Sequence, residues 1–201
     1  MYLDPYRHIP YYGHSFPVNP RSIYRQSEIE ANKYQELLRR GFKGTPITHE
    51  STAPDGIGHY RHYRDPNGRE WSIYWHPDTG AKEVHGPIRD KWVSLGREGF
   101  GYPITDEFVT NDGTGRLNYF KAVQEPGKLV KAIFWSLRTG AHPVSGPILT
   151  KWAEFGFERT LSFPIEDEKD RPGGGRIQRF QKGIITWTPQ SGASVEEMTT
   201  S

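Results

Sequence analysis

Histidine is concentrated in one part of this chain, where five of the eight histidines lie: His49, His59, His62, His76 and His85. Histidine titrates near neutral pH, so it can transfer protons, and it can also ligate a metal ion. Together with Glu50 and Asp55, the pair His59 and His62 could form a proton-transfer site. Residues three apart in a strand point to opposite faces, however, so this pair would need a β-bulge to converge. We favour solvated or capping histidines and predict no metal site.

Paired carboxylates are a second set that could do chemistry. Asp106 and Glu107, like the acidic run at 166–168, follow a Pro-Ile turn and precede a Gly-x-Gly-Arg element. Such pairs can transfer protons or bind a hard cation. Because the pattern recurs, we expect a structural role in which the carboxylates accept hydrogen bonds from Arg116 and Arg176.

Aromatic side chains are the third set, since indole faces suit the apolar faces of sugar rings. Trp92 and Trp152 fall on the apolar face of short predicted helices and are expected in the core. Other aromatic residues end predicted strands or lie outside any regular pattern. We predict that the ligand contacts come from these: Trp71, Trp75, Trp135, Tyr12 and Tyr63.

Composition excludes several classes of protein. The formal net charge is only +2 and no face carries a run of Lys or Arg, which argues against a nucleic-acid partner. The chain has no cysteine, so it has neither disulfides nor a thiolate nucleophile. No stretch approaches the length of apolar residues that a membrane-spanning helix needs. The first twenty residues lack the basic start and apolar region of an export signal.

The elements that must position these residues repeat along the chain. The stretch TGAKEVHGPIRDKW at 79–92 returns as TGAHPVSGPILTKW at 139–152, with nine of fourteen positions identical. Each repeat predicts a short helix, a Pro-containing turn and a hairpin. Pro87 and Pro147 suit the first turn of a helix, and Gly41, Gly96 and Gly156 suit helix C-caps.

This pattern predicts a β-rich α+β repeat fold, arranged as a propeller-like pseudo-symmetric ring of short-helix plus β-hairpin units. We expect an N-terminal arm with a partial repeat at 1–28. Three repeats at about 29–87, 88–147 and 148–195 then form one domain, followed by a tail at 196–201. The motif HSFPVNP near the N-terminus echoes LSFPIED of the third repeat. Closure of the ring by the two termini, or an arm packed across an open edge, would both account for this echo.

Four submotifs recur in order: IRDKWVSLG, GYPITDE, GTGRLNYF and IFWSLRTGA in the second repeat. They resemble the LGFP repeat of cell-wall-associated proteins from actinobacteria and relatives, over about residues 29–195. The resemblance implies a propeller-like assembly of helix-hairpin units and attachment to the cell envelope. The first repeat departs from the pattern, with His49 in place of Asp and His59 in place of Arg.

Two functions from different classes follow. The first is a non-catalytic module, without cofactor, that binds a cell-envelope polymer (peptidoglycan or an associated glycan) or a partner protein. The alternative is a small hydrolase, lyase or isomerase with one pocket in the divergent first repeat, for which the candidate residues are His59, His62, Glu50 and Asp55. A homodimer is left open. The resemblance implies a secreted or wall-associated protein, whereas the absence of an export signal leaves a cytoplasmic location open.

Overall fold

The computed structural model describes residues 23–123 and 130–198, which form three antiparallel sheets and three α-helices. The first sheet contains β1 (Thr45–Pro46), β2 (Ser51–Thr52), β3 (His59–Arg64), β4 (Glu70–His76) and β5 (Gly80–His85). The second contains β6 (Tyr102–Pro103), β7 (Phe108–Val109), β8 (Gly115–Lys121), β9 (Val130–Ser136) and β10 (Gly140–Ser145). The third contains β11 (Lys169–Asp170), β12 (Arg176–Phe180), β13 (Gly183–Thr188) and β14 (Gly192–Glu197). The β-rich repeat architecture is therefore confirmed.

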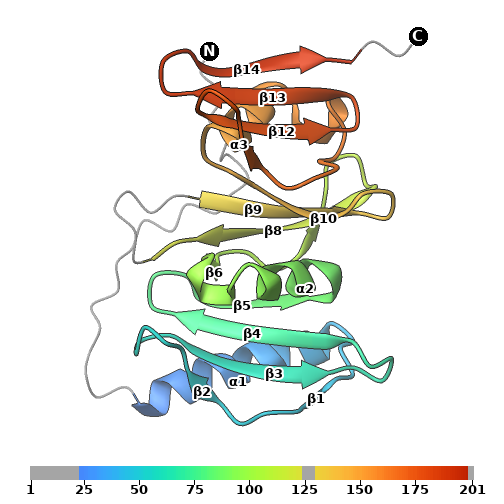
Figure 1. The fold of residues 1–201 in the computed structure, drawn as a ribbon. Coiled ribbons are helices and arrows are strands. Elements are labelled where there is room, and N and C mark those ends of the chain that lie inside the picture. Colours follow the sequence, from blue (N-terminus) through green and yellow to red (C-terminus); the bar gives the residue numbers. More distant parts are fainter. Residues whose placement is uncertain (1–22, 124–129, 199–201) are drawn as a thin grey trace.

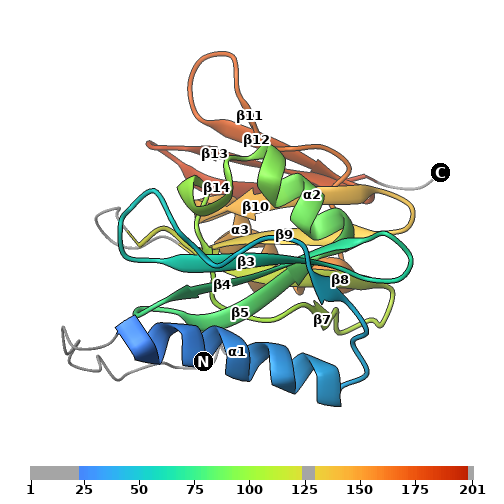
Figure 2. The same cartoon turned by 90° about the horizontal axis from the view of Figure 1, so that it is seen from below.

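The helices join the sheets in chain order. Helix α1 (Ile23–Arg39) packs against the first sheet (Figure 2) and begins within the range that the sequence assigned to the N-terminal arm. Helix α2 (Gly86–Ser94) packs against strands of the first and second sheets, and α3 (Gly146–Glu154) against strands of the second and third. Short 3-10 helices follow α2 and α3, at Arg97–Gly99 (η1) and Phe157–Arg159 (η2).

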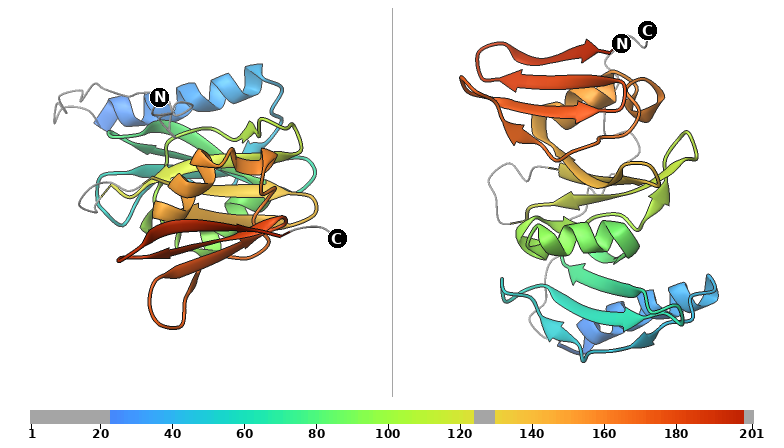
Figure 3. Two further views of the ribbon diagram at one scale, coloured as in Figure 1. Left: turned by 90° about the horizontal axis from the view of Figure 1, so that it is seen from above. Right: turned by 45° about the vertical axis from the view of Figure 1, so that its right-hand side comes forward.

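The three sheets lie one above another in a stack, with the first and third at opposite ends (Figures 1 and 3). The structure does not confirm the predicted propeller-like ring. A physical reason is that each intervening helix is placed between consecutive sheets, which extends the array in one direction instead of bending it back on itself. The arm residues 1–22, on which ring closure depended, lie outside the described residues.

Local signals in the sequence explain the helix boundaries. Pro87 and Pro147 occupy the first turns of α2 and α3. After the three helices, Gly41, Gly96 and Gly156 adopt φ values of 93°, 92° and 95°. This left-handed conformation suits glycine, so the predicted C-caps are confirmed.

Aromatic side chains fill the core between helix and sheet. Trp92 and Trp152 are both 0% exposed. The Trp92 indole N–H donates to the Gly101 carbonyl, and Trp152 packs against Phe134 and Phe180. These two tryptophans are core residues, as their helical spacing predicted.

Strand pairing establishes which positions of the repeats are equivalent. Strand β5 pairs with β4 through Ala81 opposite Trp75, and β10 pairs with β9 through Ala141 opposite Trp135. In the same register Glu83 lies opposite Ile73, as Pro143 lies opposite Ile133. Glu83 therefore corresponds to Pro143, and His85 to Ser145 two residues further on.

Two kinds of polar contact recur where consecutive repeats meet. Lys33 of α1 bonds to Asp106 of the second repeat at 2.5 Å, and Lys91 of α2 bonds in the same way to Asp167 of the third. The buried amide of Asn118 donates to the Glu83 carbonyl, as that of Gln178 donates to the Pro143 carbonyl. We call these repeated contacts the junction latches.

Candidate functional site: a groove between the first and second repeats

The histidine and carboxylate candidates of the first repeat are mostly parts of the repeated framework. His59 Nδ1 lies 3.2 Å from Glu50 Oε1. At the equivalent positions Arg116 lies 3.6 Å from Glu107, and Arg176 bonds to Glu168 at 2.6 Å. The predicted hydrogen bond is present for Arg176, whereas Arg116 and Glu107 form a longer ion pair, and His59–Glu50 is the first repeat's version of the same contact.

Asp55 and His62 belong to other contacts. Asp55 accepts hydrogen bonds from the backbone N–H groups of Ile57 and Gly58 and from the Tyr102 hydroxyl, which stabilises the turn before β3. His62 Nδ1 lies 2.8 Å from Ser72 Oγ, which accepts a bond from Arg89. Burial, with Arg89 nearby, lowers the pKa of His62 to about 4. The four enzyme candidates therefore lie in three different contact sets.

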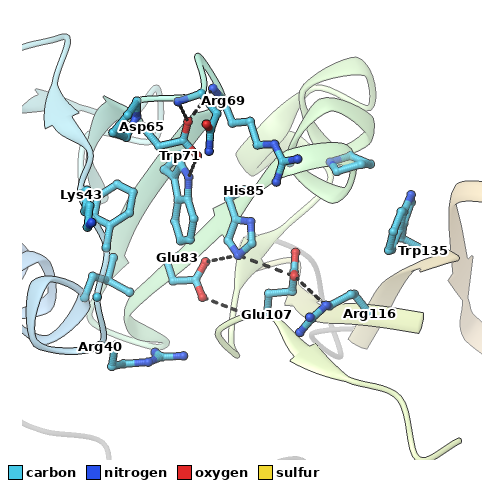
Figure 4. A pocket seen from close by; sticks show the side chains of 17 residues that line it. Arg40, Lys43, Asp65, Arg69, Trp71, Glu83, His85, Glu107, Arg116 and Trp135 are labelled. Carbon is cyan, nitrogen blue, oxygen red and sulfur yellow. Dashed lines mark hydrogen bonds and ion pairs between the residues drawn. The ribbon is translucent and has the colours of Figure 1, made fainter. Parts of the chain in front are cut away.

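An open cavity lies where the first and second repeats meet (Figure 4). Its volume is about 810 Å³, and it is lined by residues from the α1–β1 loop, the β3–β4 hairpin, β5 and the second sheet. We call this cavity the first hollow. A second hollow of about 460 Å³ shares Arg69, Gly86, Pro87 and Trp135 with it. The two hollows together form what we call the junction groove.

Glu83, His85 and Glu107 meet in the first hollow. His85 Nε2 lies 3.6 Å from Glu83 Oε2 and 3.6 Å from Glu107 Oε1 (Figure 4). These separations exceed a hydrogen bond. Glu83 is only 2% exposed, and its Oε2 has no hydrogen-bond partner among the described residues. A buried polar atom in this state is uncommon and needs an explanation.

The environment changes the protonation of all three groups. Burial, with Asp106 and Glu107 close by, raises the pKa of Glu83 to about 8. Burial raises the pKa of Glu107 to about 7, against an opposing effect of Arg116. Burial, with Arg116 and other arginines nearby, lowers the pKa of His85 to about 4. At neutral pH Glu83 is therefore largely protonated, His85 is neutral and Glu107 is about half ionised, so the inner wall offers both hydrogen-bond donors and acceptors.

The two tryptophans of the groove differ in what covers them. Trp71 is stacked on His85 with ring centroids 3.6 Å apart, and Phe42 packs on it at 4.4 Å. Trp135 is partly buried, stands across the hollow from His85 in Figure 4, and has no ring contact within the described part of the chain. Trp135 also packs against the hydrophobic cluster that contains Trp92 and Phe120, so it is a partly exposed aromatic wall of the groove.

Cationic side chains surround the opening. Lys43 and Arg69 are exposed and line the first hollow, and neither forms an ion pair among the residues that the structure describes. Arg40 is instead paired with Glu36 and Asp106, and Arg116 with Glu107. Asp65 lies in the same lining and offsets part of the Arg69 charge, but the two exposed cations still favour a ligand with a negative group.

Of the residues predicted to contact a ligand, Trp71 and Trp135 line the groove. Trp75 is 8% exposed, and Tyr63 is 1% exposed and stacked on Tyr34, so both pack in the core. Tyr12 lies outside the described residues. Sequence reasoning did not single out Glu83 or Arg69, and it treated His85 only as one of a group.

Within residues 23–123 and 130–198 no cluster of His, Asp and Glu has a geometry that could hold a metal ion. None of the described helices is long and apolar enough to cross a membrane.

The geometry is that of a repeat protein with an open groove between two units. The LGFP-repeat family model matches residues 44–99, 100–159 and 161–197. These three matches cover more than half of the chain, which therefore belongs to the LGFP-repeat family. No curated protein matches the chain.

Proposed function

We propose that this protein is a non-catalytic LGFP-repeat module that binds a cell-envelope polymer, a peptidoglycan strand or an associated glycan, in the junction groove. The observation that carries the proposal is the continuity of the two hollows through Arg69, Pro87 and Trp135. An open groove lined by two repeats suits an extended chain better than a compact metabolite. A wall-associated location agrees with family membership, and a protein partner on the same surface is the main competitor for the groove.

Cosedimentation with insoluble cell-wall material tests this function. Trp135→Ala is expected to weaken cosedimentation about tenfold, because it removes the partly exposed aromatic wall. Trp187→Ala is the matched control, since Trp187 occupies the equivalent strand position in the third repeat and does not line either hollow. Thermal melting of both variants separates loss of binding from loss of folding. Equal binding by the wild type and a wall-inert protein would contradict the proposal.

One observation favours a second candidate, an acid–base enzyme acting in the same groove. Glu107, with its pKa raised to about 7, lies beside His85 in a cavity, which is typical of proton-transfer sites. In that case Glu107→Gln is expected to abolish release of new reducing ends from wall glycans while cosedimentation persists. Absence of any such release by the wild type leaves the binding module as the function.

A further inference from the structure

The first hollow contains a polar group that the repeat fold does not require. Glu83 and His85 correspond to Pro143 and Ser145, so the same strand and the same junction form in the second repeat without them. The junction latch made by the Asn118 or Gln178 amide also persists, because its acceptor is the backbone carbonyl of position 83 or 143. The buried Glu83 carboxyl is thus an addition to the first junction.

The carboxyl accepts one hydrogen bond, at Oε1 from the Glu107 backbone N–H at 3.3 Å, and leaving its other oxygen without a partner has a cost in free energy. Its Oε2 has no hydrogen-bond partner within the described chain, although it lies in a wall of an open hollow. The His85 side chain is 24% exposed and lies in front of the buried Glu83, so a ligand hydroxyl in the hollow meets His85. Sugar hydroxyls supply several such groups at close spacing.

The opening of the hollow adds charge selectivity. Arg69 lines both hollows and, like Lys43, forms no ion pair among the described residues. A planar guanidinium binds carboxylate or phosphate oxygens through two parallel hydrogen bonds. Across the hollow Trp135 presents an aromatic ring to the same space.

We propose that the first hollow is a subsite for an acidic sugar unit: His85, with the buried Glu83 behind it, binds its hydroxyls, Arg69 with Lys43 binds its anionic group, and Trp135 packs against its apolar face. This subsite rests on the proposed function and specifies the polymer as an anionic glycan. The anionic group is a carboxylate or a phosphate, since Arg69 recognises both.

Chemically treated cell-wall material distinguishes the sources. Three preparations are compared by cosedimentation: untreated wall, wall with its carboxylates amidated by carbodiimide, and wall stripped of phosphodiester polymers by cold hydrofluoric acid. Wild-type protein is expected to bind one of the treated preparations about tenfold less than untreated wall. Loss on amidation identifies a carboxylate, and loss on acid treatment identifies a phosphate.

Variants connect that selectivity to the hollow. Arg69→Gln is expected to bind all three preparations equally weakly, whereas Arg138→Gln, which removes an exposed charge outside both hollows, keeps the wild-type preference. Glu83→Leu is expected to weaken binding, and Glu83→Gln, which keeps one donor and one acceptor, to restore most of it. Melting curves confirm that each variant is folded.

The outcomes distinguish failure of the acidic subsite from failure of the proposed polymer-binding function. Equal wild-type binding to all three preparations overturns the acidic subsite and leaves the polymer-binding function intact. No binding to any preparation overturns both. Unchanged selectivity in Arg69→Gln also overturns the subsite, because the anion would then be recognised elsewhere.

Discussion

Glu83 and His85 differ in kind from the other polar residues of the first repeat. His59 and Glu50 reproduce a contact that Arg116 makes with Glu107, so their proximity is explained by the repeat. The sequence contained this information, since His59 stands where the repeat pattern has Arg. Comparing the repeats position by position also sets Glu83 against Pro143, a signal that would have selected this residue before the structure.

The raised pKa of Glu83 makes stability depend on pH. Because the folded state holds a proton that the unfolded chain releases near pH 4.5, this group's contribution to stability is full below that pH and is lost as pH rises towards about 8. We expect Glu83→Gln to remove this pH-dependent contribution. The melting temperature of the variant should therefore rise relative to that of the wild type between pH 5 and pH 8. Parallel melting-temperature curves over this range would contradict the burial of an uncompensated carboxyl.

Trp152 provides a test of core packing at a single residue. Its side chain is fully buried among Phe134, Phe157 and Phe180. Trp152→Ala is therefore expected to lower the free energy of unfolding by about 3 to 5 kcal/mol. Denaturant titration measures this change, and a loss below about 1 kcal/mol would contradict the packing.

At the scale of elements, each repeat holds the next through a glycine as well as through the junction latches. A side chain at Gly58 would meet the Tyr102 ring, and one at Gly115 would meet the Phe163 ring. The second glycine of the Gly-x-Gly-Arg motif is thus required, because it lets the aromatic residue of the following repeat approach closely. This explains why the motif and the aromatic-Pro-Ile turn occur together.

Alanine at this glycine should therefore disturb the contact between repeats. A Cβ atom at position 115 would lie 2.4 Å from the Phe163 ring and 2.6 Å from the Trp135 carbonyl oxygen. We expect Gly115→Ala to destabilise the fold by about 2 kcal/mol or more, as overpacking does. Gly99→Ala is the control, since no atom lies within 4 Å of the added carbon. Chemical denaturation of both variants checks the difference.

The elements themselves were largely predictable. Proline at the first helical turn and glycine after the last one are local signals, and they located the starts of α2 and α3 and the ends of all three helices. The start of α1 at Ile23 was not predicted, because the first repeat departs from the apolar spacing that marked the other two helices.

At the scale of the whole molecule, the order of the repeats was predictable and their arrangement was not. Repetition in sequence requires that neighbours pack alike, yet a stack and a ring satisfy this requirement equally. The difference lies in the rotation between units, which depends on how α2 and α3 sit between the sheets. The groove was unpredictable for the same reason, since its walls come from two repeats.

The stack predicts how the molecule unfolds. Nearest-neighbour coupling through Lys91 and Asp167 joins the second and third repeats. We expect wild-type protein to melt in one transition, and Lys91→Met to broaden it or split it into two, because the third repeat then opens first. Calorimetry measures this directly. A single transition of unchanged width in the variant would show that apolar packing alone couples these repeats.

Placement of the groove between repeats fixes how many ligands the chain can hold. In the part of the chain that the structure describes, three repeats make two junctions, and only the first has Glu83 and His85, since the second has Pro143 and Ser145 at those positions. A single copy that binds as proposed is therefore monovalent. Through this groove alone it could occupy or mask a site on a polymer, but it could not cross-link two strands. Cross-linking, with the avidity that multivalency brings, would require a second copy of the chain.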